Sequence, residues 1–215
     1  MVQAVCIVGK SKVGKTTLVE KLISEFKKRG YRIAAVKHTT GEIDIDVPGK
    51  DSWRFAQAGS DAVLASSPAR LAFIKNTDSD SGIDEILRIV GGGFDLVLIE
   101  GFKEGAAPKI EVHRKELADD LVCPAQALSA VVSDDPPNIA VPHFSLDDVK
   151  GVADFIEQNF ILQTEGDISL FVNGEQVSMT PFVKEIIART ILAMVSILKG
   201  VGKIKSLDIS IRNKP

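Results

Sequence analysis

The sequence predicts an α/β protein: a mostly parallel sheet flanked by helices, followed by a small C-terminal β-β-α-β appendage. Three observations lead to this fold class. A glycine-rich loop near the N-terminus lies between a strand pattern and a helix pattern, strand and helix patterns then alternate to about residue 160, and the pattern changes beyond residue 162. The 215 residues and 45% hydrophobic content suffice for one domain of ordinary size with an appendage.

The glycine-rich loop fits the phosphate-binding pattern G-x4-G-K-[ST]. Its residues are Gly9-Lys10-Ser11-Lys12-Val13-Gly14-Lys15-Thr16. The apolar run Ala4–Val8 before it predicts a buried parallel strand, and Thr17–Arg29 after it predicts a helix. One face of that helix is apolar, with Leu18, Leu22, Ile23 and Phe26. Strand, loop and helix in this order are the setting that the pattern requires, so the sequence predicts a P-loop NTPase.

Each part of this loop has a physical role in holding a triphosphate. Glycine permits backbone conformations that turn N–H groups toward a phosphate, and the following helix adds the positive end of its dipole. We expect the whole loop and Thr17 to surround the phosphates, with Lys15 reaching the β- and γ-phosphates and the Thr16 hydroxyl binding Mg²⁺. Lys10 either stays in solvent or reaches a phosphate across a dimer interface, as an extra lysine does in one subclass of these proteins.

The rest of the first domain alternates between strand and helix patterns. We expect strands at Tyr31–Lys37, Ala62–Ala65, Leu71–Ile74, Phe94–Ile99, Ile110–Val112 and Ala127–Val132. We expect helices at Ser52–Ala58, Ile83–Val90 and Leu146–Phe160, and Gly91-Gly92-Gly93 ends the second of these. The polar stretch His38–Lys50 has the length of a functional loop.

The change in pattern divides the chain into a nucleotide-binding domain, residues 1–162, and an appendage, residues 163–215. The appendage begins with a predicted hairpin, Ile168–Val172 and Gln176–Met179, because Asn173-Gly174 between them favours a tight type I′ turn. Pro181 can begin a helix to about Leu198, and the alternation at 204–211 predicts a strand. The helix is apolar around much of its circumference, so it either contacts another body besides its sheet or lies buried in its own domain.

Acidic residues at the ends of predicted strands are candidates for binding the metal and the base. Glu100 follows an apolar strand at the sheet edge where ligands bind, and can hold Mg²⁺; otherwise it begins a solvated loop. Asp46, in the loop after the second strand, is a further candidate ligand. Asp44 and Asp51 could likewise sense the γ-phosphate and the metal, and the alternative for each of the three is a solvated loop acid. Ser133-Asp134 follows the last strand, where the aspartate can accept guanine N–H groups or the segment can simply form a turn.

Composition limits the remaining functions. A net charge of −3 argues against nucleic acid as the main partner. The longest apolar run, Ile191–Leu198, is too short to cross a bilayer, and the N-terminus lacks a signal-peptide pattern. Cys6 and Cys123 have no metal-ligand spacing and are expected to be reduced thiols in a cytoplasmic protein. The three histidines are scattered, and His38 is expected to make at most a polar contact beside the nucleotide.

Several strings occur in an order that goes beyond a generic phosphate loop. They are Gly9–Thr17, Val36-Lys37-His38, Pro48-Gly49-Lys50-Asp51-Ser52, Leu98-Ile99-Glu100-Gly101-Phe102-Lys103, Pro108-Lys109-Ile110-Glu111-Val112 and Ala130-Val131-Val132-Ser133-Asp134. Over about its first 160 residues the chain resembles the molybdopterin-guanine dinucleotide biosynthesis adaptor family, MobB. The resemblance implies a homodimer that binds GTP and Mg²⁺, is at most a slow GTPase, and assists the guanylyltransferase that attaches GMP to molybdopterin. It offers no function for the appendage.

Two other functions use the same loop. A small-molecule kinase would need cations for an anionic acceptor, which Lys103, Lys109, Arg114 and Lys115 could supply, although the same residues could contact the phosphate of molybdopterin. A metallochaperone GTPase is less favoured, because the sequence has no tract rich in histidine or cysteine. Apart from Arg54 or an arginine of a partner, no glutamine or arginine is evidently placed to orient water, so we expect slow hydrolysis. Slow hydrolysis suits an adaptor better than a kinase or a metallochaperone.

Overall fold

The computed structural model describes residues 3–41, 43, 45–136, 138–162, 168, 170–172, 175–202, 204, 207, 209 and 211. Its centre is a six-stranded sheet in the order β2-β5-β1-β6-β7-β8, and every neighbouring pair is parallel. The strands are β1 (Gln3–Val8), β2 (Ile33–Lys37), β5 (Leu96–Glu100), β6 (Lys109–His113), β7 (Leu128–Ser133) and β8 (His143–Phe144). The expected α/β class with a parallel sheet is confirmed.

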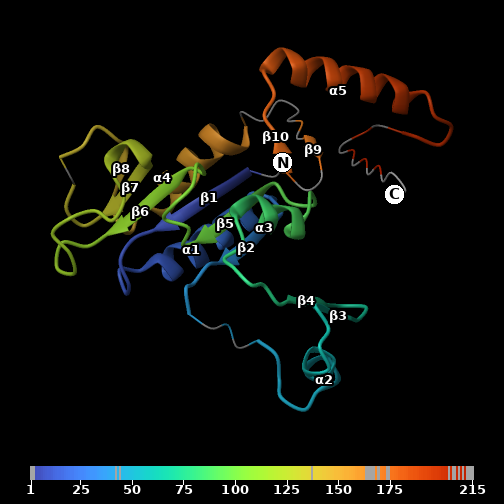
Figure 1. Cartoon of the computed structure of the whole chain (residues 1–215). Coiled ribbons are helices and arrows are strands. Elements are labelled where there is room, and N and C mark those ends of the chain that lie inside the picture. Colours follow the sequence, from blue (N-terminus) through green and yellow to red (C-terminus); the bar gives the residue numbers. More distant parts are fainter. Residues whose placement is uncertain are drawn as a thin grey trace.

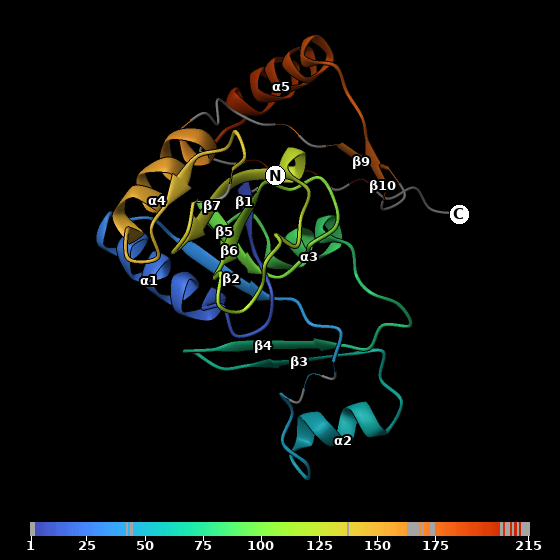
Figure 2. The same ribbon diagram turned by 90° about the vertical axis from the view of Figure 1, so that its left-hand side faces the viewer.

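Helices cover the two faces of the sheet unequally (Figure 2). One face lies under α1 (Lys15–Lys28) and α4 (Val149–Ile156), which continues as a π-helix over Glu157–Ile161. The other face lies under α3 (Ile83–Val90) and irregular segments, one of which ends in a short 3₁₀ helix, Ala125–Ala127. Parallel sheets bury both faces, so a face with a single eight-residue helix leaves room for a cleft.

The core follows from the continuous apolar strands. Five of the six residues of β1 and the first four of β5 are buried. The largest fully buried side chains that α1 and α4 contribute are Phe26, Leu22 and Ile156, which belong to one cluster with the strand residues. The amphipathic spacing of the predicted first helix therefore places its apolar face as expected, although the helix begins at Lys15, two residues earlier.

An arm, residues 39–79, projects from the body (Figures 1 and 2). It contains α2 (Asp51–Gln57) and a two-stranded antiparallel sheet of β3 (Ala62–Ser66) and β4 (Leu71–Lys75). The expected secondary structure is therefore present, but these two strands are separate from the parallel sheet. The short strand β8 is a further difference, because two residues are too few to give a periodic signal.

The appendage contains the expected hairpin strands and helix. Antiparallel strands β9 (Leu170–Val172) and β10 (Glu175–Val177) precede α5 (Pro181–Ser196), which Thr180 caps by accepting from the N–H of Val183. No residue of α5 is buried, so the helix does not lie buried in its own domain. The predicted turn residues 173–174 lie outside the described residues, as does half of 204–211, whose described residues have no regular structure.

None of the described helices combines the length and apolar character needed to span a membrane.

Candidate functional site

The phosphate-binding loop connects β1 to α1 at the carboxyl edge of the sheet. Two glycines have the positive φ angles that the pattern predicts, 138° at Gly9 and 106° at Gly14. A Cβ atom on Gly9 would lie 2.3 Å from the carbonyl oxygen of Val112, so the loop requires glycine there for space as well as for conformation. Gly14 precedes the first turn of α1, whose free N–H groups point into the loop.

The loop encloses a small cavity of about 370 Å³, which we call the cradle. Its lining residues are Ser11, Lys12, Gly14, Lys15, Thr16, Thr17, Lys37 and Glu100. Most of the predicted nucleotide-binding residues therefore gather around one space, and the size suits a group of phosphates. Gly9 lines an adjoining cleft instead, and the side chain of Val13 is buried in the core, which leaves only its backbone for a ligand.

Lys15 carries the ammonium group of the cradle. Its Nζ donates to the backbone carbonyl of Lys10 over 2.6 Å, which holds the side chain across the loop, while the Lys10 side chain itself is exposed. Desolvation lowers the pKa of Lys15; Glu100 opposes this effect, whereas Lys103 and Lys37 add to it. The polyanion of a nucleoside triphosphate would favour the charged form again, so the cradle has a cation that an anionic ligand stabilises.

Two hard oxygen ligands meet beside this lysine. The Thr16 hydroxyl donates to Oε2 of Glu100 over 2.8 Å, and Lys37 Nζ lies 3.5 Å from the other carboxylate oxygen. Mg²⁺ prefers such oxygen ligands and usually takes the rest of its shell from water and phosphate. The Thr16–Glu100 pair therefore fits the expected ion without a further protein ligand.

The structure places Asp46 elsewhere. This residue lies in the arm, where Oδ1 accepts from the Ser52 hydroxyl over 2.9 Å and from the N–H of Val47 over 3.0 Å, and it lines neither the cradle nor the adjoining cleft. Metal binding by Asp46 stays a prediction that would need the arm to move. Asp44 lies outside the described residues.

The predicted base site lies on the other side of β1. Asp134 follows β7 and accepts from the N–H of Lys115 over 3.2 Å, while Ser133 donates to the carbonyl of Asp135 over 2.6 Å and contacts His143. Arg114 connects this region to the loop by donating from Nε to the carbonyl of Val13 over 3.0 Å. Arg114 thus holds the backbone of the loop and lines neither the cradle nor the adjoining cleft.

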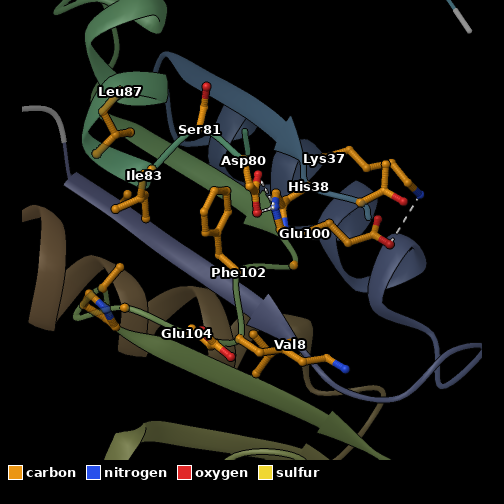
Figure 3. A pocket seen from close by; sticks show the side chains of 18 of the residues that line it. Val8, Lys37, His38, Asp80, Ser81, Ile83, Leu87, Glu100, Phe102 and Glu104 are labelled. Atoms are coloured by element: carbon orange, nitrogen blue, oxygen red, sulfur yellow. Dashed lines mark hydrogen bonds and ion pairs between the residues drawn. The ribbon is translucent and has the colours of Figure 1, made fainter. Parts of the chain in front are cut away.

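A larger cleft, about 1190 Å³, adjoins the cradle on the α3 face of the sheet (Figure 3). Phe102 and His38 stand in it with ring centroids 3.9 Å apart, and His38 Nε2 lies 2.9 Å from the nearer carboxylate oxygen of Asp80. The sequence did not connect these three residues, because Asp80 follows the arm at the point where the chain returns to the body, 42 positions after His38. Phe102 and Gly101 have φ angles of 55° and 113°, which turn the chain sharply after Glu100.

Lys109 does not contribute to a ligand site. It is 2% exposed, and its Nζ donates to the carbonyl oxygens of Gly105 and Ala107, so it fixes the segment that walls the cleft. Glu111 is equally buried and accepts from the N–H groups of Val122 and Cys123. The suggestion that Lys109 contacts an anionic ligand is therefore corrected, because its ammonium group is buried and donates to two backbone carbonyls.

The fold and the site together define a nucleotide-binding protein of the P-loop NTPase class. Comparison with known proteins shows to which family within this class the chain belongs. The family model of molybdopterin guanine dinucleotide synthesis protein B, MobB, matches residues 4–134, and the chain belongs to this family.

Individual relatives agree with this assignment. The molybdopterin-guanine dinucleotide biosynthesis adapter protein of Haemophilus influenzae is 37% identical over 152 residues, which are 70% of this chain and 85% of the relative. A putative adapter protein of the same description from Methanocaldococcus jannaschii is 29% identical and matches 95% of both chains, so the match extends into the appendage. A solved structure of molybdopterin-guanine biosynthesis protein B is 31% identical, with a TM-score of 0.57 over 72% of this chain and 97% of that one.

Proposed function

We propose that this chain is an adapter in molybdopterin guanine dinucleotide biosynthesis that holds Mg²⁺-GTP in its cradle and assists a molybdopterin guanylyltransferase. The observation that carries the nucleotide part is the convergence of Lys15, Thr16 and Glu100 on one cavity at the end of β1 and β5. Family membership supports the pathway, and the guanine, the Mg²⁺ and the partner enzyme are our extension of it. An adapter of this kind acts in the cytoplasm.

The selection of guanine would depend on Asp134. One oxygen of its carboxylate accepts from the N–H of Lys115 and the other is available to accept from N1–H and the N2 amino group of guanine. Adenine presents no such donor pair on its corresponding edge, so a carboxylate there favours GTP over ATP.

Hydrolysis would be slow. No arginine lines the described parts of the cradle or the cleft, and the glutamine among the lining residues, Gln3, begins β1 at the end opposite the loop. Arg54 lies in α2 of the arm, 3.7 Å from Asp51. Phosphate-loop proteins without an arginine or glutamine at the γ-phosphate turn over at roughly 10⁻⁴ to 10⁻² per second.

A homodimer would cover the arm. Leu64 and Phe73 are paired across β3 and β4, and together with Leu71 they share the face opposite to that of the buried Val63. Their exposed fractions are 58%, 43% and 64%. A two-stranded sheet is marginal in water unless its apolar face is covered, and a second copy of the chain would do this symmetrically. Leu64→Glu should yield monomers in sedimentation equilibrium, whereas Phe182→Glu, on α5, should not.

The central test is a calorimetric titration of the full chain with GTP and ATP, each with Mg²⁺. We expect GTP binding that Lys15→Ala weakens by about 100-fold or more, since a triphosphate contact inside a desolvated site is lost. The purified chain should then raise the rate of guanylylation by the transferase. Preference for ATP, or fast nucleotide consumption that depends on a small acceptor, would contradict the proposal and favour a kinase.

A further inference from the structure

We infer that the cleft beside the cradle binds a planar, phosphate-bearing heterocycle of the pterin class while the cradle holds a nucleotide. The inference rests on the proposed function, because it uses the cradle as the nucleotide site. It adds a second site, formed by His38, Asp80 and Phe102, beside the cradle.

The first argument is the shape of the molecule. Among the segments that wall the cleft on this face of the sheet are α3 and residues 101–108, and the cleft has a volume of about 1190 Å³. Pockets for small ligands are commonly of about 300–1,000 Å³, so the cleft is large enough for a bicyclic or tricyclic ring system with a side chain. Apolar side chains of Val8, Ile83 and Leu87 line it together with polar groups, as in ligand sites in general.

The second argument is the aromatic pair. Phe102 is held in the cleft by a left-handed backbone conformation, with a φ angle of 55°, that a bulky residue adopts only under constraint. Its ring stacks on His38 at an interplanar angle of 31°, and the imidazole is fixed in turn by Asp80. Figure 3 shows the Phe102 ring standing between β1 and α3, where a flat ring can stack on it.

The third argument is that the cleft carries groups of both charges. Lys37 and Lys103 both act on the pKa of Lys15, so the three ammonium groups lie near one another at the end shared with the cradle, together with Glu100. The other carboxylates of the lining include Asp84, which belongs to α3, and Asp80, which contacts His38. A pterin has the matching polarity, because its pyrimidine ring presents N–H donors that carboxylates accept and its side chain ends in a phosphate that ammonium groups bind.

The order of the strands argues that the nucleoside of GTP lies elsewhere. Asp134 follows β7, two strands from β1 in one direction, whereas Phe102 follows β5 and His38 follows β2 in the other direction. A nucleotide whose base reaches Asp134 therefore leaves the cleft free. Its γ-phosphate would point to the residues that line both cavities, Ser11, Lys15, Lys37 and Glu100, so the two ligands would meet phosphate to phosphate.

The test is a fluorescence titration of the full chain with pterin-6-carboxylic acid, a fluorescent anionic pterin, with and without saturating Mg²⁺-GTP. We expect binding in both conditions. Phe102→Ala should weaken it by about tenfold or more, the usual effect of losing one stacking partner. Phe94→Ala, which removes a partly buried ring that lies outside the cleft and faces Arg32, should leave it unchanged. Lys103→Ala should weaken it more at low salt than at high salt, and Lys115→Ala should not.

Thermal unfolding and GTP titration of each variant establish that the fold and the cradle are intact. Displacement of the pterin by GTP in one-to-one competition would overturn the inference, since the cleft would then be the nucleoside pocket. Equal pterin affinity of the wild type and Phe102→Ala would overturn it too. If GTP binds and the pterin does not, the inference fails and the proposed function stands; if GTP does not bind either, the proposed function fails.

Discussion

The hydroxyl of Thr16 donates a 2.8 Å hydrogen bond to a carboxylate oxygen of Glu100, although 84 positions separate them in the chain. The parallel pairing of β1 and β5, with Ile7 opposite Glu100, brings them together. Each residue follows or ends a strand at the same edge of the sheet, so the two oxygens are in place before a metal arrives. Preorganisation of this kind lowers the cost of binding the ion.

Thr16 and Glu100 should act as one unit in binding Mg²⁺. Thr16→Ala and Glu100→Gln should each weaken Mg²⁺-GTP binding by about tenfold or more, and the double variant should lose little beyond the larger single loss, because both remove the same ion. Calorimetry with Mg²⁺ and with EDTA measures this. Binding in EDTA should differ little between the wild type and the variants. Losses that simply add would show that the two residues contact different ligands.

GTP affinity should fall as the pH rises. The fall should begin at a lower pH than it would if the pKa of Lys15 were that of an ordinary lysine. Burial lowers the pKa of Lys15, so the ammonium group that binds the phosphates loses its proton earlier. Titrations between about pH 7 and about pH 10 should show this fall in the wild type. Lys15→Ala should bind weakly throughout with a much flatter profile. Parallel profiles for the two proteins would assign the titration to another group.

Gly9→Ala should destabilise the fold and abolish nucleotide binding. The new Cβ atom would lie 2.3 Å from the Val112 carbonyl oxygen at a φ angle of 138°, so backbone must shift in both β6 and the loop. We expect a loss of about 2–4 kcal/mol in the free energy of unfolding. Gly92→Ala, where nothing lies within 4 Å of the new atom, is the matched control and should be near neutral. Similar stability for both variants would contradict the close approach.

Glu157 should stabilise the protein above mildly acidic pH. It accepts from the Tyr31 hydroxyl and from Arg29, and these contacts lower its pKa. Because the folded pKa lies below the unfolded value, the contribution is present at neutral pH and is lost as the pH falls through the folded pKa. Glu157→Gln should cost about 1–3 kcal/mol near pH 7 and progressively less below about pH 4.

The control for Glu157 is Glu185→Gln, the same substitution in an exposed ion pair with Arg189 on α5. It should change the free energy of unfolding by less than about 0.5 kcal/mol. Urea unfolding at several pH values measures both variants. An equal effect of the two substitutions at neutral pH would mean that the Tyr31–Arg29–Glu157 contacts contribute no more than a surface pair.

The sequence was sufficient for the parts of the fold that repeat a local pattern. The phosphate loop has glycines at fixed spacing, and the strands β1 and β5 are continuous apolar runs, so their positions and the roles expected of Lys15, Thr16 and Glu100 could be inferred. The family followed from strings that surround these elements, and the match over residues 4–134 confirms it.

Residues joined only by tertiary structure could not be inferred in this way. His38, Asp80 and Phe102 belong to three segments with different spacing, and a single histidine at a strand end predicts no partner. The burial of Lys109 was likewise hidden, since a lysine in a short strand gives no sign that backbone carbonyls will surround its ammonium group. Nor does local spacing reveal that β3 and β4 leave the main sheet, because a hairpin has the same pattern in either place.

The contact between His38 and Asp80 also joins the two residues that flank the arm, which are 42 positions apart. The entropic cost of closing such a loop grows only with the logarithm of its length, so segments of quite different size can be inserted between these two residues at nearly the same cost in free energy. We therefore expect that the arm can be shortened, lengthened or replaced with little cost in loop closure, provided that the contact between His38 and Asp80 is kept.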